Sequence, residues 1–349
     1  MRAMACLLLV VVAVAAGAMK GEGRSLGAGQ ILFGGTAYAP MKPFLGVQIF
    51  RASTEKGSCQ RILAFAPAEA RGVQFTRDGR YAILTLGGSL TPSSAIVGMR
   101  FIDLRGGKTW DVPNIEGAVS TGGMWIAASD QHGHLLVMRN DGSDSRVVAT
   151  RSGRSVEYGT AWSPNDRWLA VSVSTGGGAD GPPLKTHLEV ANLATGSARV
   201  IYKEPNPYSY RPYPVWSPDS RLLYVWGVEH PFVIARDGSG RHFLPVEAGQ
   251  GIWSPDGRRI AFIGHGRWGV NDVFVANADG SRARALTATK PPPIGEEQRG
   301  SVPLAWSPDG RQILYLRRFT LTVMNANGSV SRAICQPPRG TQGAVTWTK

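Results

Sequence analysis

The sequence predicts an all-β protein, a single seven-bladed β-propeller of four-stranded blades, from three observations. The segment Trp-Ser-Pro-Asp-Gly-Arg at 253–258 returns at 306–311 and, with changes, at four earlier places. The copies recur at intervals of 37 to 54 residues, which is the repeat length of propeller blades. The 349 residues include 44 Gly and 23 Pro, only 18% are charged, and no long amphipathic helical pattern is present after the N-terminal segment.

Each copy of the segment predicts a β-hairpin. A first strand, A, ends on a head residue, a turn follows, and a second apolar strand, B, begins after it. Pro in the turn presets φ, and Gly closes a type I turn without the steric cost of a Cβ. The head residues, in chain order, are Phe75, Val119, Trp162, Trp216, Trp253, Trp306 and Trp347.

A third strand, C, and a short fourth strand, D, complete each repeat, as in 274–277 and 284–287. The same frame places B, C and D strands at 30–33, 47–50 and 61–65, with no A strand before them. Residues 344–348 supply that missing strand. We therefore expect the C-terminal strand to join the N-terminal blade and to close the ring without an open edge.

The expected organisation is a signal peptide at 1–18, a short linker at 19–28 and the propeller at 29–349. One early charge, Arg2, precedes an apolar run that ends in small residues, as export signals do. An uncleaved anchor is the alternative, although the apolar run is shorter than the roughly 20 residues that cross a bilayer. We expect an exported protein, periplasmic or extracellular, with no transmembrane segment after signal cleavage.

Two cysteines, Cys59 and Cys335, remain once Cys6 leaves with the signal. Export permits a disulfide between them. The strand map places Cys59 at the start of an outer strand on one face of the ring. It places Cys335 at the end of a neighbouring outer strand on the opposite face. Two separate thiols are therefore favoured, and a bridge is the alternative.

The Trp-Ser-Pro-Asp-Gly turn, the Ile-Ala-Phe strand and the Asn-Ala-Asp-Gly turn together resemble the TolB-like propeller repeat, a WSPDG-type or PD40-like repeat. The resemblance covers residues 29–349, and similar repeats form the propeller halves of prolyl-oligopeptidase-like enzymes. We expect neither the N-terminal domain of TolB nor a hydrolase domain. Strands begin soon after the signal, and no Gly-x-Ser-x-Gly segment is present.

The recurring acids and aromatic heads are expected to be structural. Asp78, Asp219, Asp256 and Asp309 each lie in a turn whose conformation already explains them. The Trp heads are expected to pack between blades rather than to stack on a sugar. The six histidines show no metal-binding spacing such as His-Glu-x-x-His, so no metal and no cofactor are predicted.

The formal net charge is +13, and much of it is Arg placed just after turns. We expect these arginines to form ion pairs between blades with the turn acids. The remaining positive charge favours anionic partners. Nucleic acid is not among them, because an exported protein without a recognition module does not fit that function.

Strand order predicts which face of the ring binds a partner. The short A–B and C–D turns share one face, which we call the turn face. The longer B–C and D–A loops share the other, the loop face, and loops carried by a rigid scaffold often bind ligands. The candidate binding residues there are Tyr208, Tyr210, Arg211, Tyr213, His265, Arg267 and Trp268. The alternative is that prolines in 202–214 stiffen the connection and the tyrosines cover blade ends.

The resemblance and the loop face together predict an exported, non-enzymatic, TolB-like scaffold of the cell envelope. Its partner would be a protein or an anionic envelope ligand. The alternative function is an enzyme or a lectin-like carbohydrate module that uses the central funnel. An enzyme would need ionisable groups converging at that funnel, and none is visible in the sequence.

Overall fold

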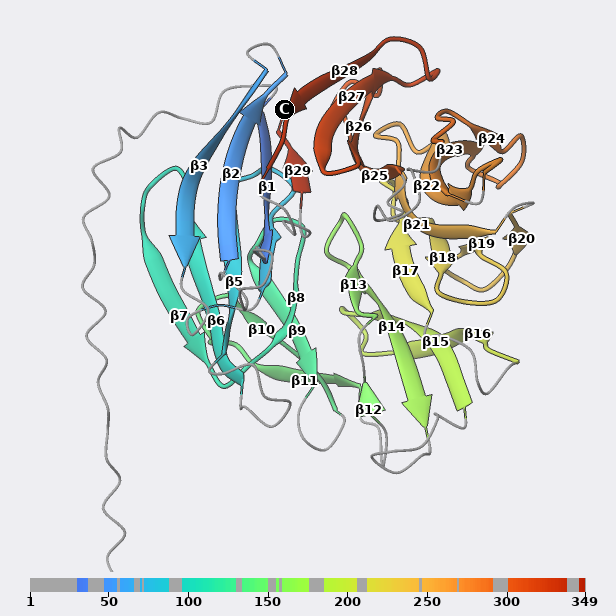
Figure 1. The fold of residues 1–349 in the computed structure, drawn as a ribbon. Helices are drawn as coiled ribbons and strands as arrows, with labels where there is room; N and C mark the ends of the chain where they lie inside the picture. The colour runs from blue at the N-terminus through green and yellow to red at the C-terminus, as the bar shows by residue number, and fades with distance from the viewer. Residues whose placement is uncertain are drawn as a thin grey trace, which may run out of the picture.

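The structure is a computed structural model that describes residues 30–36, 47–54, 57–65, 70, 72–87, 96–129, 134–149, 155–156, 159–175, 185–205, 212–244, 247–268, 270–290, 301–337 and 345–348. Its regular elements are all strands, and they form seven sheets arranged around a ring (Figure 1). The predicted all-β, seven-bladed propeller is confirmed. Within these residues, no helix is long and apolar enough to cross a membrane.

The first three blades follow the predicted A to D order from the centre outward. Blade 1 contains β29 (Val345–Trp347), β1 (Gln30–Thr36), β2 (Val47–Ser53) and β3 (Ser58–Phe65). Blade 2 contains β4 (Gly72–Phe75), β5 (Tyr81–Gly87), β6 (Ile96–Asp103) and β7 (Thr109–Pro113). Blade 3 contains β8 (Gly117–Val119), β9 (Trp125–Ser129), β10 (Leu135–Arg139) and β11 (Arg146–Ala149).

Blade 4 departs slightly, because two short strands, β12 (Ser155–Val156) and β13 (Ala161–Trp162), both pair with β14 (Trp168–Thr175); β15 (Lys185–Asn192) and β16 (Ala198–Lys203) follow. Blade 5 contains β17 (Tyr213–Trp216), β18 (Leu222–Trp226), β19 (Phe232–Ala235) and β20 (His242–Phe243). Blade 6 contains β21 (Ala248–Trp253), β22 (Arg259–His265), β23 (Asn271–Asn277) and β24 (Arg284–Ala285). Blade 7 contains β25 (Ser301–Trp306), β26 (Gln312–Arg317), β27 (Thr320–Asn325) and β28 (Ser331–Cys335).

The ring closes as predicted, by pairing the two ends of the chain in one blade. β29 runs antiparallel to β1, with Ile31 opposite Trp347 and Phe33 opposite Val345. The amide of Thr348 also donates to the carbonyl of Gln30 at 2.9 Å. This closure removes the open inner edge that β1 would otherwise present.

The Trp heads pack between blades, and each bonds to the innermost strand of the preceding blade. Trp162, Trp216, Trp253 and Trp306 are all buried. Their indole N–H groups donate to the carbonyls of Ala118, Ala161, Val215 and Ile252 at 2.9, 3.0, 2.9 and 3.2 Å. The heads therefore fill the space between blades and also satisfy carbonyls on the free inner edges of the ring.

The turn acids are structural, as predicted. In blade 6, the Ser254 hydroxyl and the Arg258 amide donate to Oδ1 of Asp256 at 2.6 and 3.1 Å. Gly257 adopts a φ of 70°, which favours glycine. The same carboxylate bonds recur at Asp219 and Asp309, so each acid holds its own turn closed.

The two kinds of turn share one face, as strand order predicted. The amide of Leu104 in a C–D turn donates to the carbonyl of Arg80 in the A–B turn of the same blade at 2.8 Å. Equivalent bonds join Leu193 to Arg167 and Ala326 to Arg311. In each of these blades, the A–B turn and the C–D turn therefore lie side by side on the turn face and share a backbone hydrogen bond.

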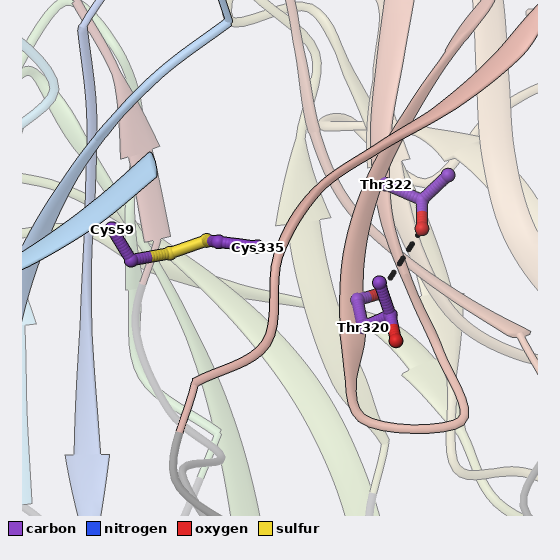
Figure 2. Close-up of a disulfide and its surroundings, with 4 residues drawn as sticks. All are labelled: Cys59, Thr320, Thr322 and Cys335. Carbon is purple, nitrogen blue, oxygen red and sulfur yellow. Dashed lines mark hydrogen bonds between the residues drawn. A yellow bond between two sulfur atoms is a disulfide. The ribbon is translucent and has the colours of Figure 1, made fainter. Parts of the chain in front are cut away.

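The expectation of two separate thiols is wrong, because Cys59 and Cys335 form a disulfide between blades 1 and 7 (Figure 2). Their Cα atoms are 5.8 Å apart, within the usual range for a disulfide. The physical reason is blade twist, which turns each outer strand away from the direction of the inner one. The end of one D strand therefore meets the C–D turn of the next blade.

This meeting recurs around the ring and explains the position of the disulfide. A Cβ added to Gly142, Gly196 or Gly238, each in a C–D turn, would lie within 4 Å of the D strand of the preceding blade. The equivalent glycine of blade 1, Gly57, faces the carbonyl of Ile334. Cys59 and Cys335 lie on either side of this contact. They are brought together because a D strand meets the C–D turn of the next blade, an arrangement that several pairs of neighbouring blades share.

The expectation of ion pairs between blades is also wrong for Arg80, Arg221 and Arg311, because each of them pairs with an acid of its own blade. Arg221 and Arg311 contact Asp219 and Asp309 of their own turns at 4.0 and 3.9 Å. Arg80 likewise pairs with Asp103 of its own blade. Two arginines do bond between blades, but to backbone carbonyls and not to acids. Arg259 and Arg284 donate to the carbonyls of Gly310 and Asn327 in the next blade.

Candidate functional site

The candidate site is the B–C turn of blade 6, on the loop face between β22 and β23. Its backbone is closed by the amide of Gly266, which donates to the carbonyl of Val270 at 2.9 Å. The Arg267 guanidinium carbon lies 5.1 Å from the centre of the Trp268 ring, and Trp268 is 48% exposed. The turn therefore presents a flat aromatic surface with a cation stacked on it.

His265 and Glu247 extend this surface as an exposed imidazole–carboxylate pair. The imidazole Nε2 of His265 lies 3.6 Å from Oε2 of Glu247, and both side chains are well exposed. His265 is opposite Asn271 in the ladder that leads into and out of the turn. The structure thus brings His265, Arg267 and Trp268 together on one element, as the sequence predicted for the loop face.

The remaining predicted residues come from the connection that enters blade 5. Tyr213, at the start of β17, is partly buried and stacks on Trp226 with ring centres 4.4 Å apart. Its ring covers the end of the blade, in agreement with the alternative interpretation of this connection. Tyr208, Tyr210 and Arg211 lie outside the described residues.

A buried acid that the sequence analysis missed supports the blade 6 turn. Asp272 is 1% exposed and accepts hydrogen bonds from the Thr287 hydroxyl at 2.6 Å and the Thr289 amide at 2.8 Å. A Cβ on Gly266 would collide with the same carboxylate. Asp272 thus ties the D–A connection to the B–C turn. An acid within the apolar run of β23 was the signal that could have revealed it.

The described innermost strands, which surround the axis of the ring, carry no carboxylate, imidazole, thiol or basic side chain. The innermost strands β4, β8, β13, β17, β21, β25 and β29 contain no Asp, Glu, Lys, Arg, His or Cys. In the part of the chain that the structure describes, no group of three His, Cys, Asp or Glu residues could hold a metal ion. The described innermost strands therefore carry small, apolar, amide and hydroxyl side chains, among them Tyr213, Ser301 and Thr346.

The carboxylates around the turn face are already engaged by their own turns. The Ser307 hydroxyl and the Arg311 amide both donate to Asp309, and they hold the pKa of this carboxyl below its ordinary value. Asp166 differs, because burial raises its pKa although the Thr121 amide donates to it. In blade 4 that carboxylate joins two neighbouring turns, so it also acts structurally.

One further ionisable pair lies within the ring and was not predicted. Nε2 of His187 is 2.6 Å from Oε1 of Glu189, and their side chains are only 13% and 8% exposed. Both residues lie on β15, two positions apart, so they share one face of the strand. The spacing of these two ionisable residues within the strand was the available signal. Their burial limits the access of any substrate to them.

The geometry defines a class of protein, a closed seven-bladed propeller whose blades carry aromatic heads and Ser-Pro-Asp-Gly turns. No protein-family model matches the sequence. The chain is 32% identical over 162 residues to the Tol-Pal system protein TolB of Anaeromyxobacter dehalogenans strain 2CP-C, a match that covers 44% of this chain and 35% of that protein. TolB of Anaeromyxobacter sp. strain K matches with the same identity and coverage.

The chain is a seven-bladed propeller that is similar to TolB, and the match spans about a third of the length of these curated relatives. Among solved structures, the oligogalacturonate lyase of Vibrio parahaemolyticus has a TM-score of 0.56 at 14% identity, over 89% of this chain and 87% of that one. The tricorn protease has a TM-score of 0.55 at 11% identity, over 93% of this chain and 36% of that one. At these identities the similarity shows the fold alone.

Proposed function

We propose that this chain is an exported, non-enzymatic propeller that binds a protein partner of the cell envelope on its loop face. The observation that carries the proposal is the chemistry of the described innermost strands, which hold no Asp, Glu, Lys, Arg, His or Cys. General acid–base catalysis most often uses such groups, and the hydroxyl groups that remain would need an adjacent base to act as nucleophiles. Binding needs only an accessible surface of suitable chemistry.

The blade 6 turn supplies that surface. Trp268 and Arg267 are residue types that anchor protein interfaces, and the stacked pair offers both apolar contact and a cation. The net charge of +13 adds a general attraction to acidic partners. We therefore expect binding that weakens as salt concentration rises. The matched relatives carry the name of a Tol-Pal system protein, which supports a protein partner over a small molecule.

Export has independent support from the disulfide. Cys59 and Cys335 are joined, and disulfides form and persist in oxidising compartments such as the periplasm or the extracellular space. The apolar N-terminal segment, which has the pattern of an export signal, also favours a location outside the cytoplasm.

The test is a pull-down from the envelope fraction of the producing cells, with the disulfide-bonded protein immobilised. Two double variants are compared with the unmodified chain: Arg267→Ala with Trp268→Ala on the loop face, and Arg258→Ala with Arg311→Ala on the turn face. Both pairs are exposed, so neither should change stability by more than about 0.5 kcal/mol.

A partner that is captured by the unmodified chain and the turn-face variant, but lost with the loop-face variant, supports the proposal. Loss with the turn-face variant alone would show that the other face binds. Turnover of an oligosaccharide by the purified protein, abolished by His187→Gln, would refute the non-enzymatic assignment and favour the buried pair as a catalytic site.

A further inference from the structure

Blade 1 is built differently from the other blades, because no turn joins its A strand to its B strand. In blades 2 to 7 a tight turn links the two strands covalently. In blade 1 the A strand is β29 and the B strand is β1, and they come from opposite ends of the sequence. The ladder between them contains three residue pairs, as many as the β8–β9 ladder of blade 3, but unlike that ladder it has no turn that joins its two strands. The β29–β1 contact is therefore the seam of the ring.

The disulfide crosses this seam. Cys59 lies in β3, which belongs to the β1 side, and Cys335 ends β28, on the side from which the chain continues to β29. The two cysteines are separated by 276 residues, so the bond encloses most of the chain in one covalent loop. Around it, Phe33 and Phe50 of blade 1 pack with Ile334 of blade 7 in one buried cluster.

We propose that the Cys59–Cys335 pair is a redox-controlled latch on the closed ring. In the oxidised form the bond holds blade 1 against blade 7 and keeps β29 beside β1, so the short ladder persists. In the reduced form β29 and blade 7 separate from β1, β2 and β3 before any other junction opens. Opening exposes the backbone edge of β1, which could then pair with β29 of a second copy of this chain.

Latching is a two-electron oxidation. The two thiols lose two protons and two electrons as the S–S bond forms, and a disulfide-form oxidant takes up the electrons and protons while its own S–S bond breaks to two thiols. A dithiol reverses the step by attack on the bond, and it leaves as a disulfide. Because such oxidants prevail outside the cytoplasm, ring closure would be coupled to export.

The test is hydrogen exchange of the folded, disulfide-bonded protein before and after reduction with dithiothreitol. We expect reduction to raise exchange in β1 and β29 at least about tenfold, which corresponds to about 1.4 kcal/mol in the local opening equilibrium. Peptides from β21 and β22, which a turn joins covalently, serve as the internal reference and should not change. Reduced samples are also examined for dimers by size-exclusion chromatography.

The double variant Cys59→Ser with Cys335→Ser is the matched control. It should show the fast exchange at the seam in either redox condition, and dithiothreitol should have no effect on it. If the variant fails to fold, reduction of the folded unmodified protein still decides the question. Exchange that stays unchanged at the seam, or that rises equally in all blades, would overturn the latch, because the bond would then be neutral or a general support of the fold.

Discussion

Replacing a Trp head by Phe tests the bond that links neighbouring blades. Trp253 is 8% exposed, and its indole N–H donates to the carbonyl of Val215 at 2.9 Å. The variant Trp253→Phe keeps an aromatic ring in the space between blades 5 and 6 but removes the donor. The Val215 carbonyl lies on β17, which pairs only with β18, so the indole is its partner on the free edge.

The expected loss has two parts. A buried carbonyl left without its donor costs about 1–3 kcal/mol. The smaller ring leaves part of the interblade space empty, which adds roughly 1 kcal/mol, well below the 3–5 kcal/mol of a complete Trp truncation. We therefore expect a loss of about 2–4 kcal/mol in the free energy of unfolding, a large share of the 5–15 kcal/mol typical of folded proteins.

Urea denaturation followed by fluorescence measures this loss, with Trp268→Phe as the control. Trp268 is 48% exposed, so its replacement should change stability by no more than about 0.5 kcal/mol. If Trp253→Phe is no more destabilising than the control, the heads do not hold the blades together in the way that their hydrogen bonds indicate.

Two further predictions concern the closure and the turns. Deleting residues 343–349 removes β29 and should lower the melting temperature or cause aggregation even with the disulfide intact, because β1 loses its inner partner; unchanged melting would contradict closure by this strand. Gly257→Ala should cost about 1 kcal/mol because Gly257 has a φ of 70°, whereas the same change at Gly249, which lacks a positive φ, should cost less. Urea denaturation curves distinguish the two glycines.

The parts of the fold that the sequence predicted are those set by local chemistry and repetition. The Ser-Pro-Asp-Gly turns specify their own hydrogen bonds within about five residues, as at Ser254 and Asp256. The period of the heads then fixed the blades. The unpaired strands at the two ends of the chain left one consistent closure, between β1 and β29.

The parts that the sequence did not predict depend on how blades sit against each other. The disulfide was missed because strand order alone places Cys59 and Cys335 on opposite faces, whereas blade twist brings the end of a D strand to the next C–D turn. The interblade contact of Arg259 was predicted with the wrong acceptor, because its guanidinium donates to a backbone carbonyl, which has no sequence signature, and not to a turn acid.

The candidate site was predicted in part. The blade 6 turn could be found from its composition, because Trp268 and Arg267 stand out in a loop between two apolar strands. The role of Asp272 could not, because its partners Thr287 and Thr289 follow only after a further turn and strand. Composition also suggested Tyr213 as a binding residue, but its ring stacks on Trp226 and covers the end of the blade.

Two turn acids should respond to pH with opposite signs. The hydrogen bonds from Ser307 and Arg311 lower the pKa of Asp309 in the folded chain, so its contribution is present at neutral pH and is lost as pH falls through the folded pKa. Burial raises the pKa of Asp166, so the folded chain binds more protons there than the unfolded chain, and stability falls as pH rises through that window.

Asparagine is the suitable replacement at both positions, because the native chain already uses it at the position equivalent to Asp309, and because it tolerates the positive φ of 54° at Asp166. Asn165 holds the equivalent turn of blade 4 closed through bonds from Ser163 and Arg167, as Asp309 does in blade 7. Asp309→Asn should therefore lower stability at about pH 7, and this loss should shrink at an acid pH below the lowered folded pKa, where the carboxyl is protonated. Asp166→Asn should raise stability at about pH 7, because the amide oxygen can still accept from Thr121 without the cost of burying a charge. Urea denaturation at the two pH values separates these effects, and a change of the same sign at pH 7 for both variants would show that burial does not dominate at Asp166.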